Sequence, residues 1–146
     1  MSSDELSGQR RKPVKVGVRQ GGGPPPGYVW NVDVLDCAHQ EAIAFLSEEQ
    51  HAYLRELVKE LARWPEPSNQ PLIDVRRVAD VFEIRDKGGL LGKINVRIFF
   101  CIDHDTRTIA VLSVINKKND GPTPKVDKIR ATSRRRRYLE QYSGES

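Results

Sequence analysis

The run from residue 94 to residue 103 alternates between two sets of side chains, and this alternation constrains the fold more than any other feature. One set is wholly apolar and consists of Ile94, Val96, Ile98, Phe100 and Ile102. The other set is mixed and consists of Asn95, Arg97, Phe99 and Cys101. Because successive side chains of a β-strand point to opposite faces, this spacing predicts a strand with one face in a hydrophobic core.

Further strands and helices are predicted on either side of this run. Residues 28–35 alternate like a first strand, residues 82–85 precede a glycine-bearing loop, and residues 108–116 return after a hairpin turn at 103–106. Asp36 is positioned to cap a helix over 36–45, and a capping box of Ser47 and Gln50 begins a second helix that Pro65 ends. A last helix is predicted over 125–141, and residues 66–80 read as an irregular connection.

The order of these elements predicts an α+β fold, a small antiparallel sheet with two N-terminal helices and one C-terminal helix. We expect the helices to cover one face of the sheet and to leave the other partly open. Residues 1–27 end in a block of glycines and prolines and predict a flexible basic arm, followed by one domain over 28–142 and a tail over 143–146.

Basic side chains gather on the predicted sheet and at both ends of the chain. Arg85 and Arg97 lie inside strand-like runs, and Lys117 and Lys118 follow the last run. Residues 1–27 carry 5 basic and 2 acidic side chains, and residues 117–146 carry 9 basic and 4 acidic ones. Cations on a small sheet favour a polyanionic partner, of which RNA and DNA are the simplest.

Arg97 has two possible environments on the basis of the pattern alone. On the expected open face its neighbours at spacing two are Asn95 and Phe99, and such a row can hydrogen-bond, neutralise a phosphate and stack on a base. Alternatively, Arg97 forms an ion pair with Glu83 or Asp86 across the sheet. The pattern does not decide between the two.

The chain resembles the RelE/ParE superfamily of bacterial toxins, and most closely its HigB-like, phage-associated branch. The resemblance rests on the order of three passages: residues 82–85, residues 96–100, and residues 114–118 followed by Thr123-Pro124. It implies a microbial RNase fold and an endoribonuclease that cleaves mRNA on the ribosome and so inhibits translation. It also implies a helix-turn-helix antitoxin as partner, with operator DNA bound only through that antitoxin.

The resemblance also assigns roles to basic residues. Arg97 corresponds to the strand arginine that stabilises the transition state, and Arg85 to the arginine of the preceding strand near the phosphate. Lys117 and Lys118 occupy the basic stretch after the last strand. A lysine acts as acid or base only where burial or neighbouring cations favour its neutral form, so Lys117 or Lys118 is the candidate for proton transfer.

The remaining polar residues give weaker signals. Four adjacent arginines cannot all be buried on one helix, and we expect contact with RNA or an antitoxin from Arg134, Arg135, Arg136 and Arg137. The chain's three histidines, His39, His51 and His104, read as surface or turn residues, which leaves the general base unassigned. No metal-ligand cluster, cofactor signature, signal peptide or membrane span is recognisable, and a cytoplasmic location is expected by default.

Two further functions stay open. ParE-type relatives share the fold but inhibit DNA gyrase by binding, and a chain without an assigned general base is compatible with that activity. A second alternative is an inactive relative that binds RNA or protein only.

Overall fold

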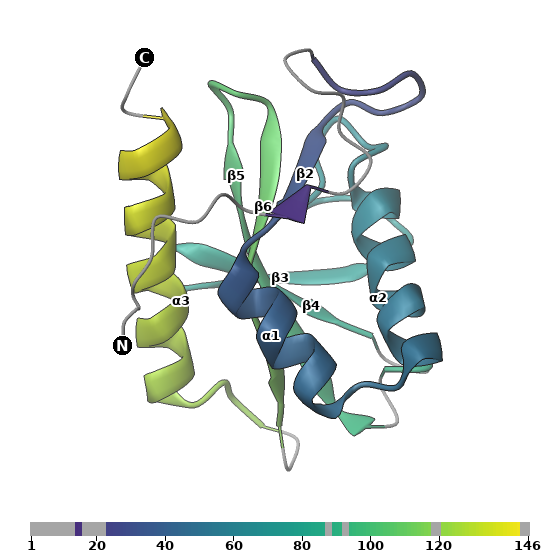
Figure 1. Cartoon of the computed structure of the whole chain (residues 1–146), viewed down its shortest axis with the longest axis vertical. Helices are drawn as coiled ribbons and strands as arrows, with labels where there is room; N and C mark the ends of the chain where they lie inside the picture. The colour runs from purple at the N-terminus through teal and green to yellow at the C-terminus, as the bar shows by residue number, and fades with distance from the viewer. Residues whose placement is uncertain (1–13, 16–22, 87–88, 92–93, 118–120, 144–146) are drawn as a thin grey trace.

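A computed structural model of the protein describes residues 14–15, 23–86, 89–91, 94–117 and 121–143 (Figure 1). The described strands are β1 (Val14–Lys15), β2 (Asn31–Val34), β3 (Asp74–Val78), β4 (Val81–Arg85), β5 (Val96–Asp103) and β6 (Thr108–Asn116). The described helices are α1 (Asp36–Phe45), α2 (Glu48–Leu61) and α3 (Lys125–Tyr138), which a π-helical turn at Leu139–Ser143 extends.

The described strands form one sheet in the order β1-β2-β6-β5-β4-β3. Only the pair β2–β6 is parallel in this sheet of the described residues, and all other neighbours are antiparallel. The predicted α+β fold, with a largely antiparallel sheet, two N-terminal helices and one C-terminal helix, is therefore confirmed. Within the predicted arm, Val14–Lys15 pair with β2.

The face of the sheet that α2 covers, here called the α2 face, carries the main hydrophobic core. It receives the apolar set of β5, including Val96, Ile98 and Phe100, all at most 2% exposed. Leu54, Val58 and Leu61 of α2 belong to the same core. Burying one side chain of this size contributes roughly 1.5–3 kcal/mol, so this face supplies much of the stability.

The start of α2 follows the sequence prediction. The amide of Gln50 donates to Ser47 Oγ at 3.1 Å, and the amide of Ser47 donates to Gln50 Oε1 at 2.8 Å. This reciprocal capping box is confirmed. For α1 the prediction was wrong, because the N-cap is Leu35, and Asp36 is the first helical residue and not its cap.

The opposite face, here called the α3 face, is covered by α3, so the expectation of a partly open face was wrong. Figure 1 shows α3 and α2 on opposite sides of the sheet. Phe99 and Cys101 of β5 and Leu112 of β6 are buried with Ala131 and Tyr138 of α3. A second, smaller core therefore lies beneath this helix.

Helix α1 lies against the part of β6 that extends beyond its pairing with β2, where β5 is the remaining strand partner. Strand β2 pairs with β6 only as far as Val111. Beyond that point, Glu41 of α1 accepts hydrogen bonds from the Val114 amide and from Ser113 Oγ, both at 3.0 Å. The Glu41 carboxylate thus accepts from a backbone N–H that would otherwise lie unpaired at an open edge of the sheet.

Strand β3 lies in the stretch that we predicted to be irregular, and that prediction was wrong. Residues 74–78 pair along their whole length with β4. The adjacent pair Arg76-Arg77 hides the alternation, because both faces of this strand carry an exposed cation. Charged side chains are typical of edge strands, where they oppose pairing with other chains.

Candidate functional site

Arg85 and Arg97 are direct cross-strand partners on β4 and β5. Their side chains therefore share one face of the sheet, and alternation along β5 places them on the α3 face. Cross-strand partners have Cβ atoms about 5 Å apart. Two guanidinium groups so close require a counter-charge, and the structure supplies one.

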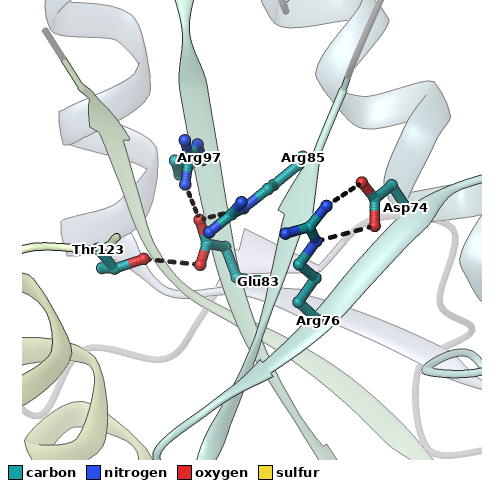
Figure 2. Close-up of polar contacts among 6 residues, drawn as sticks. All are labelled: Asp74, Arg76, Glu83, Arg85, Arg97 and Thr123. Atoms are coloured by element: carbon teal, nitrogen blue, oxygen red, sulfur yellow. Dashed lines mark hydrogen bonds and ion pairs between the residues drawn. The ribbon is translucent and has the colours of Figure 1, made fainter. Parts of the chain in front are cut away.

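That counter-charge is the carboxylate of Glu83, which is buried at 0% exposure (Figure 2). Arg97 Nη1 and Arg85 Nε both donate to Glu83 Oε2, the latter at 3.2 Å. Thr123 Oγ1 donates to the other oxygen, Oε1, at 2.7 Å. Of the two environments left open for Arg97, the structure therefore shows the ion pair with Glu83.

The Glu83 carboxylate holds the two arginines in place and leaves most of their N–H donors available to a ligand. Each guanidinium has five N–H donors, and Glu83 accepts one from Arg97 and one from Arg85. The three groups together keep a net positive charge. The side chain of Arg85 is 18% exposed and that of Arg97 is 5% exposed, so Arg85 lies nearer the solvent.

Thr123 connects this cluster to the passage that leads into α3. Its side chain is buried, and it is followed by Pro124, the N-cap of the helix. The sequence analysis used Thr123 only as part of the resemblance and Glu83 only as a possible ion-pair partner. The available signal was the alternation Phe82-Glu83-Ile84-Arg85, which places Glu83 and Arg85 on one face.

Lys117 follows β6 and lies opposite the start of β5. Its amide donates to the carbonyl of Asn95 at 3.0 Å, which holds it beside the start of β5. The side chain of Lys117 is buried at 6% exposure. Asn95 has a φ of 56°, a left-handed conformation that asparagine tolerates better than most residues. Lys118 lies outside the described residues.

Phe99 does not have the environment that we predicted for an RNA-stacking residue. Its side chain is 0% exposed and belongs to the core beneath α3. A ring enclosed on both sides has no face for a base, so this structure assigns Phe99 a packing role. The expected row of Asn95, Arg97 and Phe99 on an open face is therefore absent from the described surface.

The arginine run on α3 divides into structural and exposed members. Arg134 Nη1 donates to the carbonyl of Leu112 at 2.9 Å and lies 3.0 Å from Glu41 Oε2, which ties α3 to β6 and α1. Arg135 is half-buried, whereas Arg136 and Arg137 are exposed. Of the run, Arg136 and Arg137 thus present the most surface to a partner.

The histidines and Tyr138 of α3 have other contacts. His39 and His51 pack edge to face at 5.2 Å between ring centroids, and His104 packs in the same way on Trp30 at 5.5 Å. Tyr138 Oη donates to Asp33 at 3.0 Å, and burial and then this carboxylate raise the tyrosine pKa above its usual range. These contacts assign none of them as the general base.

In the part of the chain that the structure describes, no group of three or more histidine, cysteine, aspartate or glutamate side chains is arranged to hold a metal ion. No helix among these residues is long and apolar enough to cross a membrane.

The chain matches a protein family and several chains of solved structures. No curated protein matches the chain significantly. The solved toxin–antitoxin complex RelBE2 from Mycobacterium tuberculosis contains a chain with 22% identity and a TM-score of 0.42, over 62% of this protein and 99% of that chain. Residues 41–136 match the family described as phage derived protein Gp49-like. Because this match spans more than half of the 146 residues, the chain belongs to the Gp49-like family, a RelE/HigB-type family of toxins from toxin–antitoxin systems.

Proposed function

We propose that this toxin is an endoribonuclease that cleaves mRNA on the ribosome and thereby inhibits translation. The observation that carries the proposal is the convergence of Arg85 and Arg97 on one buried carboxylate, Glu83. The reaction we propose is metal-independent, as the resemblance to RelE and HigB toxins implies. Residues 28–142 would form the toxin domain, and residues 1–27 the arm that precedes it.

The chemistry of RNA cleavage explains why fixed arginines are needed. When a 2′-hydroxyl attacks the adjacent phosphate, negative charge builds on the non-bridging oxygens. A guanidinium held in place beforehand stabilises that charge without reorganising, and one such donor typically accelerates a reaction by about 10²–10³. Glu83 provides this preorganisation for Arg85 and Arg97, because it holds both cations from a position inside the sheet.

We propose that access to Arg97 requires a movement of the passage of residues 121–124 before α3. The side chain of Arg97 is 5% exposed, and the Thr123 hydroxyl holds this passage against Glu83. We propose that RNA first contacts Arg85 and that displacement of the passage then opens the way to Arg97. Lys117 or Lys118 would transfer a proton, and Asn95 would contact the RNA beside them.

The exposed end of the arginine run supplies a second area of positive charge. Arg136 and Arg137 are exposed on α3, and Arg135 is half-buried. We propose that these residues contact ribosomal or messenger RNA. The partner that neutralises the toxin would be a helix-turn-helix antitoxin, through which the complex would bind operator DNA.

The experiment induces the wild type and Arg97→Ala in a tolerant bacterium and maps the 5′ ends of mRNA after a few minutes. New ends within codons are expected for the wild type, with a loss of about 10²–10³ in cleavage for the variant. Arg97→Lys keeps the ion pair but not the planar fork, and should lose most activity while keeping its fold. Full cleavage by folded Arg97→Ala would refute the assignment.

A second candidate is a toxin that acts by binding alone, as ParE-type gyrase inhibitors do. The enclosure of Arg97 favours this candidate, because a side chain at 5% exposure that is paired with a buried carboxylate presents little surface to an RNA phosphate. Growth arrest with intact mRNA and inhibited DNA supercoiling would support it. Binding to RNA without growth arrest would instead indicate an inactive relative.

A further inference from the structure

The α3 face carries a third arginine on its outer edge, and nothing in the sequence pattern pointed to it. Arg76 of β3 is the cross-strand partner of Glu83. In the same register, Asp74 is the partner of Arg85. Because direct partners point to the same side of a sheet, Arg76 shares the face of Arg85 and Arg97. Figure 2 shows the three arginines together with Glu83.

The three arginines form a gradient of exposure across neighbouring strands. The side chain of Arg76 on β3 is 43% exposed, that of Arg85 on β4 is 18% exposed, and that of Arg97 on β5 is 5% exposed. Neighbouring strands lie about 4.8 Å apart, so the series crosses roughly 10 Å from the sheet edge to its interior. A polyanion arriving from solvent therefore meets Arg76 first.

The ion pairs within this series differ in how readily they can be exchanged. Arg76 Nε and Nη2 each donate to a carboxylate oxygen of Asp74 at 3.4 Å, and both side chains are partly exposed. Such surface pairs contribute little to stability, so a phosphate can replace Asp74 at little cost. Glu83, by contrast, is buried and keeps its hold on Arg85 and Arg97.

We propose that Arg76 binds the RNA backbone at the edge of the sheet, at a phosphate that flanks the one delivered to Arg85 and Arg97. Arg76 is a binding residue in this proposal and takes no part in the chemical step. The inference rests on the proposed ribonuclease function, which it extends by defining the side from which the RNA strand enters.

The next residue in the chain offers a matched control. Arg77 lies on the same strand with the same charge, and it is exposed like Arg76, but it belongs to the opposite face. Its guanidinium lies 5.8 Å from the centroid of the Phe82 ring, and its Nε donates to the carbonyl of Ala79 at 3.3 Å. Arg76→Ala and Arg77→Ala therefore change net charge equally and differ in the face they affect.

The test uses the full-length protein in a cell-free translation reaction, with cleavage of a reporter mRNA followed by primer extension at several salt concentrations. Arg76→Ala should raise the toxin concentration for half-maximal cleavage about tenfold, as expected for one lost charge-assisted contact, while the maximal rate stays unchanged. Its salt dependence should weaken by about 0.7 in log–log slope, the value for one phosphate contact on a single strand. Arg77→Ala should change neither quantity appreciably.

The possible outcomes separate this inference from the proposed function. If the wild type cleaves and the two variants behave alike, the role of Arg76 is refuted and the ribonuclease assignment stands. If Arg76→Ala lowers the maximal rate and leaves the half-maximal concentration unchanged, the binding role is also refuted. If the wild type leaves the reporter intact, the proposed function fails and the inference fails with it. Matching thermal melts of both variants show that each is folded.

Discussion

The two faces of the sheet differ in what they bury, although one strand supplies both. On the α2 face, β5 places Val96, Ile98 and Phe100 against apolar side chains of α2. On the α3 face the same strand places Phe99 in a small core and Arg97 in an ionic cluster with Glu83. The α2 face is thus explained by hydrophobic burial alone, whereas the α3 face is not.

The ionic cluster of the α3 face carries a cost in free energy, because its charged groups are removed from water. Charged groups lose hydration when they are buried, and replacing a buried ion pair by apolar residues often leaves a protein as stable or more stable. The side chains of Glu83, at 0% exposure, and Arg97, at 5%, are therefore poor choices for stability alone. Departures of this kind from the rules of core packing are expected at functional sites. This difference between the two faces of the sheet supports the α3 face as the site of function.

The largest predicted effect comes from removing the carboxylate at the centre of that cluster. Glu83→Leu leaves the buried Arg97 and the partly buried Arg85 without their acceptor. Breaking a buried pair in this way costs about 3–5 kcal/mol of unfolding free energy, which urea denaturation followed by circular dichroism measures. A loss below about 1 kcal/mol would mean that the cluster is solvated and that the contrast between the faces is overstated.

A second substitution tests whether the lost stability comes from the unpaired Arg97. Adding Arg97→Met to Glu83→Leu removes the stranded cation and should recover most of the lost stability. The double variant should nevertheless be inactive in the mRNA cleavage assay.

Combining Glu83→Leu with Val58→Ala on the α2 face should give additive losses of stability, since the two sites belong to different faces. Strong coupling between Glu83 and Val58 would contradict the separation of the faces.

A smaller loss of stability is expected from removing the hydrogen bond between Thr123, just before α3, and Glu83. Thr123→Val keeps the shape of the side chain but removes the hydroxyl that donates to Glu83 Oε1 at 2.7 Å. A hydrogen bond to a charged group contributes about 1.5–3 kcal/mol, so the variant should be destabilised by that order. Because this hydroxyl ties residues 121–124 to Glu83, hydrogen exchange in that passage should also quicken. Thr123→Ser, which keeps the donor, serves as the control and should show neither change.

The sequence predicted the α2 face better than the α3 face for a physical reason. Apolar alternation in β5 and the capping box at Ser47 are local patterns, and each was confirmed. The contacts of Glu83 instead join residues 14 and 40 positions apart, and no local pattern encodes such pairings. Two of the candidate residues, Arg85 and Arg97, are brought together by the structure, but Glu83 had entered only as an alternative partner.

Helix α3 and strand β3 show why the burial of the α3 face and the position of Arg76 could not be predicted from the sequence. The buried residues of α3 are Ala131 and Tyr138, which are too few to reveal which side of this arginine-rich helix faces the sheet. Without that information, the α3 face was predicted to be open and Phe99 to be available for stacking. In β3 the adjacent arginines masked the alternation, and Arg76 was missed with the strand that carries it.

The smallest predicted effect concerns titration on the outer surface of α1 and α2. Burial, and then the neighbouring Arg55 and His39, lower the pKa of His51 below its ordinary value, and Arg55 Nη1 lies 2.9 Å from His51 Nδ1. The unfolded chain therefore binds a proton more readily than the folded one. Stability from this group is fully present above the ordinary histidine pKa of about 6.5 and is lost as the pH falls through the lowered value.

Urea denaturation at pH 7 and at successively lower pH measures this effect. The wild type should lose a small amount of stability over that interval, and His51→Gln should lose less, because glutamine does not titrate. The Glu83 cluster should be unaffected by this substitution, since His51 belongs to α2 and lies against His39 of α1. An unchanged pH slope in His51→Gln would show that its contact with Arg55 and His39 does not persist in solution, whereas a reduced slope would assign this titration to the helical layer.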